Sequence, residues 1–102
     1  MEVPEQLRVY PCLDYFSSSL AADGFWDEPG QLWLIETAEH VKEDLEAEFL
    51  QIGRPGVDSI GFGYRKNQPG FWALHRMERQ FHFLAPSVQE FLDVWLAGRI
   101  SL

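Results

Sequence analysis

The 102-residue sequence predicts a single α+β domain, in which an antiparallel β-meander sheet is packed by helices on one side. Three observations predict this class. Apolar residues alternate with a period of two over most of residues 49–85, which is typical of half-buried strands. Short turns rich in glycine and polar residues separate these segments and favour antiparallel neighbours. A capped amphipathic helix over about residues 87–97 then needs an apolar surface to cover, and the sheet provides one.

The first 35 residues predict short elements. Leu7–Cys12 is β-prone and interrupted by a proline, which suits an edge strand or the lead-in to a turn, and residues 13–22 predict a short helix. Turn-forming residues bracket Phe25 and Trp26, and the run Gln31–Ile35 predicts a strand.

Residues 36–48 predict an acidic surface helix. Thr37 is placed to cap its start, and Ala38, Val41 and Leu45 form a narrow apolar stripe at helical spacing. Because the other faces are mostly acidic, we expect this helix to bury only one edge.

The second half of the chain predicts four strands joined by short turns. On one of them, Ile60, Phe62 and Tyr64 share a face, whereas two glycines leave the other face nearly bare. Glycines in this position indicate that another segment approaches closely. The predicted strands are Phe49–Ile52, Asp58–Arg65, Phe71–Met77 and Gln80–Ala85.

The C-terminal helix carries the clearest local signals. Ser87 and Glu90 have the spacing of a capping box, and Gly98 is placed to end the helix. Ser87 also follows a strand, where hydrolases place a nucleophile, but the glycines of the G-x-S-x-G elbow are missing. We therefore interpret Ser87 as a helix cap. The apolar face consists of Val88, Phe91, Leu92, Trp95 and Leu96.

The remaining reactive residues do not form a pattern that indicates catalysis. His75 and His82 lie on consecutive strands and can face each other if the turn is two residues long, but no third metal ligand follows at a recognisable spacing. Cys12 lacks the basic surroundings of a reactive thiol and is expected to be a small buried side chain. We expect neither an enzyme, nor a metal, nor a cofactor. Of the four tryptophans, Trp26 lies beside Asp27 and Glu28 in a turn and can anchor an interface, while the others are core candidates.

Composition and charge narrow the possible partners. No apolar run approaches the roughly 18 residues of a membrane span, and the acidic start does not resemble a signal peptide. With a single cysteine, no intrachain disulfide is possible, and we expect a cytoplasmic protein that does not associate with membranes. The net charge of −8 disfavours nucleic acid, because phosphate binding depends on cationic groups.

The charge is also unevenly distributed. Residues 1–50 contain twelve acidic and two basic residues, a net charge of −10, whereas residues 51–102 have a net charge of +2. The acidic residues are densest over residues 23–48. Such a segment is either a solvated face or a docking surface for a basic partner, where charge raises the association rate.

Two stretches resemble the SUKH superfamily, FLQIGRPGVDSIGFGYR and PGFWALHRMERQFHFLAPSVQEFLDVWLAGRI. The matching features are a strand that ends in Ile52-Gly53, a glycine-containing strand after it, and a closing helix with Ala85, Ser87, Phe91 and Leu92 in the family's pattern. The resemblance covers about residues 31–102. Residues 1–30 do not reproduce the family's amino-terminal region, so the chain is similar to a shortened or divergent member.

The resemblance implies binding without catalysis. Bacterial members of this superfamily act as immunity proteins against toxins, which are often nucleases, and eukaryotic members resemble scaffolding or regulatory modules. Because nuclease surfaces are commonly basic, an acidic inhibitor would complement them. Our leading hypothesis is an immunity-type protein that neutralises a basic toxin domain, and the alternative is an intracellular scaffold or regulatory module. The expected contact residues are Trp26, Asp27, Glu28, Glu39, Glu43, Asp44 and Glu46.

The oligomeric state stays open at this point. An edge strand such as Leu7–Cys12 can pair with its counterpart in a second chain, so a homodimer is one of the possibilities.

Overall fold

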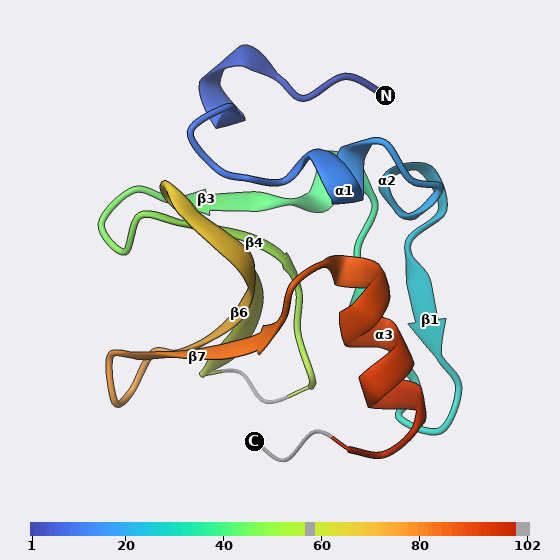
Figure 1. Ribbon diagram of the computed structural model, residues 1–102. Helices are drawn as coiled ribbons and strands as arrows, with labels where there is room; N and C mark the ends of the chain where they lie inside the picture. Colours follow the sequence, from blue (N-terminus) through green and yellow to red (C-terminus); the bar gives the residue numbers. More distant parts are fainter. Residues whose placement is uncertain (57–58, 100–102) are drawn as a thin grey trace.

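An antiparallel sheet forms the centre of the computed structural model, which describes residues 1–56 and 59–99 (Figure 1). The fold is α+β, as predicted. Over the described residues the sheet has seven strands, β1 (Phe25–Asp27), β2 (Leu32–Ile35), β3 (Lys42–Asp44), β4 (Phe49–Gly53), β5 (Ile60–Arg65), β6 (Gln68–His75) and β7 (Gln80–Ala85). The helices are α1 (Leu13–Phe16), α2 (Leu20–Asp23) and α3 (Val88–Leu96), with 3₁₀ turns η1 (Glu5–Leu7) and η2 (Ala38–His40).

The strands follow the order β1-β2-β4-β5-β6-β7, and β3 pairs with β4 on the side that β2 also occupies. Ile35 of β2 pairs with Gly53 at one end of β4, and Lys42 of β3 pairs with Gln51 farther along the same strand. Strands β2 and β3 therefore share one side of β4, and β1 continues the sheet beyond β2. The predicted meander of β5, β6 and β7 is confirmed, although the expected start of β5 at Asp58 lies outside the described residues.

The hairpin turns share one backbone feature. The residue before the second strand has a left-handed φ of 52° to 57° in each of four hairpins, at Gln31, Glu48, Asn67 and Arg79. Between β5 and β6 the turn consists only of Lys66 and Asn67, so β6 begins at Gln68 and not at Phe71 as expected.

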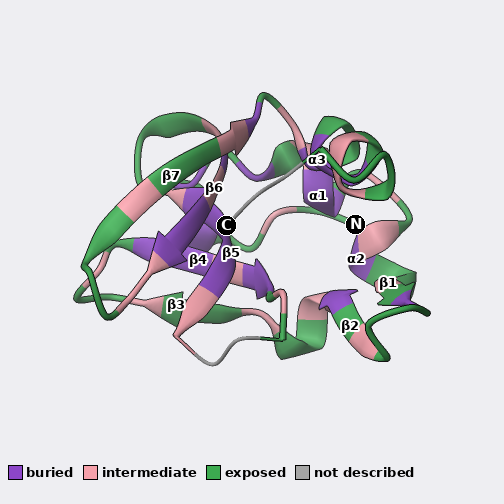
Figure 2. Ribbon diagram, turned by 90° about the horizontal axis from the view of Figure 1, so that it is seen from below, coloured by how far each residue is buried: buried purple, intermediate pink, exposed green. Residues whose placement is uncertain are grey.

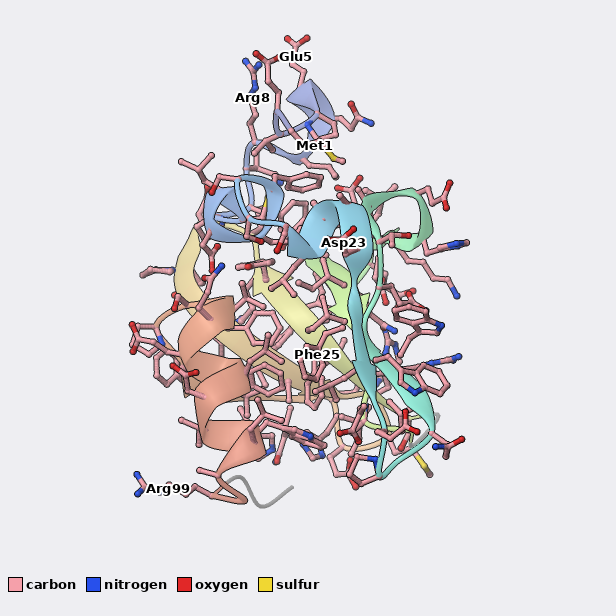
Figure 3. All side chains as sticks on the ribbon, turned by 90° about the vertical axis from the view of Figure 1, so that its right-hand side faces the viewer. Met1, Glu5, Arg8, Asp23, Phe25 and Arg99 are labelled. Atoms are coloured by element: carbon pink, nitrogen blue, oxygen red, sulfur yellow. The ribbon has the colours of Figure 1, made fainter. Side chains whose placement is uncertain are left out.

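The helices cover one face of the sheet and enclose the main core with it (Figure 1). Phe91 of α3 contacts both Phe62 and Phe71, with ring centroids 4.8 Å apart in each pair. Val88 and Leu92 are buried beside it, whereas Leu96 is exposed, so the apolar face of α3 is narrower than predicted. Phe25 of β1 also packs against this core, on the side opposite α3 (Figure 3).

Asp14 joins α1, the sheet and α3. One of its carboxylate oxygens accepts a hydrogen bond from the Tyr64 hydroxyl at 2.9 Å, and the other accepts from the Val88 backbone N–H at 2.8 Å. Ser87 caps the same helix, because its Oγ accepts from the Glu90 backbone N–H at 3.2 Å. The predicted cap is confirmed. Burial, and then the neighbouring Asp14 carboxylate, raise the pKa of Tyr64, which stays a neutral donor.

A smaller cluster lies on the opposite, open face of the sheet. Phe49 and Leu74 are buried there but do not belong to the main core. The Arg65 guanidinium covers this cluster, at 4.1 Å from the ring centroid of Phe81 and 4.7 Å from that of Trp72. The open face is therefore closed in part by a cation stacked on aromatic rings.

The helix expected over residues 36–48 is wrong. This segment contains η2, β3 and a turn, in which the Asp44 side chain accepts from the Ala47 backbone N–H. Leu45, the last residue of the expected stripe, is 77% exposed, and Thr37 makes no cap hydrogen bond. Pairing with the buried strand β4 satisfies the backbone here, and it overrides a weak helical pattern that had little apolar surface to bury.

Of the two alternatives for Leu7–Cys12, the edge strand is wrong and the lead-in to a turn is confirmed. Leu7 ends η1, and the following residues form turns in which the Tyr10 backbone N–H donates to the Leu7 carbonyl. The segment therefore offers no edge to a second chain. Cys12 is fully buried, as expected, and burial raises the pKa of its thiol to about 11.

Candidate protein-interaction surface

Two exposed tryptophans form the centre of the candidate surface. Trp26 of β1 and Trp33 of β2 are direct cross-strand partners, and their rings meet edge to face with centroids 5.4 Å apart. They remain 41% and 48% exposed. Strand alternation explains this exposure, because Phe25 and Leu34 on the same two strands point to the core. Large aromatic side chains in such positions are typical anchors of protein interfaces.

Carboxylates border this tryptophan pair. The Trp26 indole N–H donates to the Glu28 carboxylate at 2.8 Å, which fixes the ring and holds an acid beside it. On the other side, Trp33 lines a groove of about 400 Å³ together with Glu36, Thr37, Glu39 and His40. The Thr37 hydroxyl oxygen is buried there and has no hydrogen-bond partner among the described residues. We call Trp26, Glu28, Trp33, Glu36 and Glu39 the tryptophan surface.

The chemistry of the tryptophan surface suits a cationic side chain. Ring faces attract lysine and arginine electrostatically, and neighbouring carboxylates add charge-assisted hydrogen bonds. The acids Glu28, Glu36 and Glu39 form no ion pair with a lysine or arginine among the described residues. Glu39 lies 3.5 Å from the His40 imidazole, and Glu28 accepts from Trp26, so these acids can pair with a cationic partner without breaking a lysine or arginine ion pair.

The other four expected contact residues lie apart from this surface or serve the fold. Asp27 is buried and its carboxylate accepts from the Gly30 backbone N–H at 3.2 Å, which closes the β1–β2 turn. Glu43 accepts from the Tyr10 hydroxyl at 2.9 Å, and Asp44 lies 3.7 Å from Arg76. Glu46 lines a separate groove with Arg76. The seven expected contact residues therefore do not form one continuous surface.

Trp33 and Glu36 were not among the expected contact residues. Trp33 was expected in the core because its segment is apolar throughout. Alternation along Leu32–Leu34 is the signal that places its side chain opposite to those of Leu32 and Leu34. The pairing of Trp33 with Trp26 depends on strand β1, which was not predicted because turn-forming residues lie on both sides of it.

The His75 and His82 side chains were expected to face each other if the hairpin turn had two residues. The His75 and His82 ring centroids are 4.3 Å apart, although the connecting turn has four residues and their backbones are not direct partners. The part of the chain that the structure describes contains no group of three His, Cys, Asp or Glu side chains that could hold a metal ion. Within these same residues, no helix has both the length and the apolar character needed to cross a membrane.

Comparison with protein-family models, with curated proteins and with solved structures finds no match for this chain.

Proposed function

We propose that the chain is a non-catalytic protein-binding domain that docks a basic partner on the tryptophan surface. The observation that carries this proposal is the exposed Trp26–Trp33 pair bordered by carboxylates. Burying two indole rings would supply most of the affinity, and the net charge of −10 in residues 1–50 would steer a basic protein toward this side.

The resemblance to the SUKH superfamily supports a narrower role, that of an immunity-type protein. In this role the partner is a basic toxin domain, and a nuclease is the example that the charge favours. The capped helix α3, the glycine-containing strand β5 and the strand ending in Gly53 are the features of this resemblance. Binding at the tryptophan surface would block the toxin by covering its cationic, substrate-binding side.

The proposal predicts a gene for a basic toxin domain beside this one, and the test is to co-express the two chains and to measure growth and the dissociation constant. We expect Trp33→Ala to weaken binding about 30-fold or more, the usual range for a buried interface tryptophan. Glu39→Lys should weaken binding more at low salt than at high salt, because salt screens the electrostatic attraction that this variant loses. Both side chains are exposed, so both variants should fold normally.

Two charge reversals act as matched controls. Glu78→Lys changes an exposed acid in the β6–β7 turn, and Glu46→Lys changes an exposed acid outside the tryptophan surface. Both should leave the dissociation constant within about twofold of the wild type. An equal loss of affinity in Glu46→Lys and Glu39→Lys would mean that binding depends on the overall acidity of the chain, and the tryptophan surface would then not be the binding site. Toxin binding without protection of growth would favour a scaffold role.

A further inference from the structure

The side of the sheet formed by β1 and β3 is protected against pairing with another strand. β1 has three residues and an irregular register between Phe25 and Trp26. β3 consists of Lys42, Glu43 and Asp44, all charged. Shortness, irregularity and charge are the devices by which proteins prevent edge-to-edge association.

Strand β7, at the other end of the strand order, is longer and uncharged, and the irregularity in its register with β6 is confined to its end, between Phe83 and Ala85. Its six residues, QFHFLA, include neither a charged residue nor a proline. No described strand pairs with its outer side, and Phe83 is 56% exposed. Figure 2 shows the contrast: β7 is exposed or half-buried along most of its length, whereas β4, β5 and β6 are largely buried. Such a strand presents a row of unpaired backbone groups to another chain.

We propose that β7 pairs antiparallel with β7 of a second copy of this chain, so that the two sheets become one. In an antiparallel pair, opposite residues lie on the same face of the sheet. A two-fold axis between two identical strands therefore lies midway between the two copies of one residue, which face each other. Ala85 is buried next to the start of α3, so residues 80–84 are available for pairing with a second copy. The exposed His82 is the middle residue of this segment and is therefore placed on the axis. His82 then faces its counterpart, and Phe81 faces Phe83 of the second copy.

The aromatic residues of the open face match this register. Phe81 and Phe83 pair with Leu74 and Trp72 on that face, and Phe83 meets the Trp72 ring at 5.3 Å between centroids. Phe81 in turn contacts Phe49 at 5.7 Å. The row of rings therefore runs out to the edge at Phe83, and the second copy continues it with Phe81. Aromatic pairs opposite each other are among the favourable cross-strand contacts.

If two copies associate, charge favours contact at this edge over contact at the other. Two chains of net charge −8 repel each other, and they do so most strongly where residues 1–50, with a net charge of −10, approach. Pairing through the uncharged β7 brings no like charges opposite each other within the strand. Because β1 and β2 lie at the far end of the strand order, the tryptophan surfaces stay free in the dimer.

The test is a charge exchange at His82. The wild type should sediment at about 100 µM with twice the mass of one chain, and its β7 amides should exchange more slowly at that concentration than at about 2 µM. His82→Lys and His82→Glu should each raise the dimer dissociation constant at least about tenfold, because like charges then face each other. An equimolar mixture of the two variants should recover the dimer. This recovery excludes misfolding as the cause of the loss.

Lys42→Glu, on the opposite side of the sheet, is the matched control and should leave the dimer unchanged. A wild type that stays monomeric at about 200 µM overturns the proposal, even if an added extended peptide of another sequence binds β7. Variants that remain dimeric, or a mixture that stays monomeric, overturn it equally. None of these measurements depends on the tryptophan surface, so the outcome is separate from that of the proposed function.

Discussion

The two faces of the sheet are stabilised in different ways. On the covered face, α3 presses Phe91 between Phe62 and Phe71, and all three rings are fully buried. On the open face, Arg65 lies over Phe81 and Trp72, and solvent reaches each of these three side chains in part. The first arrangement depends on close packing without water. The second arrangement depends on a cation stacked on aromatic rings, and this contact tolerates water.

This difference predicts how each face responds to the loss of a ring. Removing a side chain from a closed core leaves a cavity that neither water nor neighbouring atoms fill well. On the open face, water and the long Arg65 stem can occupy the vacated space. The same chemical change should therefore have unequal effects on the two faces.

Phe91→Ala should give the largest effect, lowering the free energy of unfolding by about 4 kcal/mol. Phe81→Ala is its counterpart on the open face and should cost about 1–2 kcal/mol, since less area is buried there. Urea denaturation followed by tryptophan fluorescence measures both values. Equal losses in the two variants would mean that the open face is as closely packed as the core, and the comparison between the faces would be wrong.

The second half of the fold was predictable because its signals are local. Alternation marks β4 to β7, glycine and asparagine mark the first two of the turns between them, and Ser87 with Glu90 marks the start of α3. The segment over residues 36–48 has no comparable local signal, since its charged residues suit either a surface helix or an edge strand. Its structure is decided by pairing with β4, in which Lys42 lies opposite Gln51. The periodicity of the sequence does not reveal such a pairing.

The candidate surface was predictable only in part. The sequence marks Trp26 and Glu28 as exposed turn residues, and both lie on the tryptophan surface. The prediction treated the acidic segment as one helix, and so it grouped Glu43 and Asp44 with Glu39. In the structure, Glu43 and Asp44 hold Tyr10 and the β3–β4 turn. Density of charge along a chain does not reveal which charges the fold uses for its own hydrogen bonds.

Asp14 tests how firmly the covered face is held together, with the second largest effect. Asp14→Ala removes acceptors for the Tyr64 hydroxyl and the Val88 N–H, so we expect a loss of about 2–3 kcal/mol. Asp14→Asn keeps one acceptor oxygen and should cost about half as much. Asp23→Ala removes an exposed acid from α2 and should change stability by less than about 0.5 kcal/mol. A loss in Asp14→Ala no larger than in Asp23→Ala would show that α1 does not hold α3 on the sheet.

Ser87→Ala should give the smallest of these effects, about 1 kcal/mol, because it removes one capping acceptor from α3 while Asp14 still holds the neighbouring N–H. Ser87→Thr retains the acceptor and should stay close to the wild type. Since Ser87 lies at the covered face and the tryptophan surface lies on β1 and β2, we expect Ser87→Ala to bind the partner with unchanged affinity. The measurement pairs urea denaturation with a binding titration on the same sample. A loss of binding with full stability would give Ser87 a role that a helix cap does not explain.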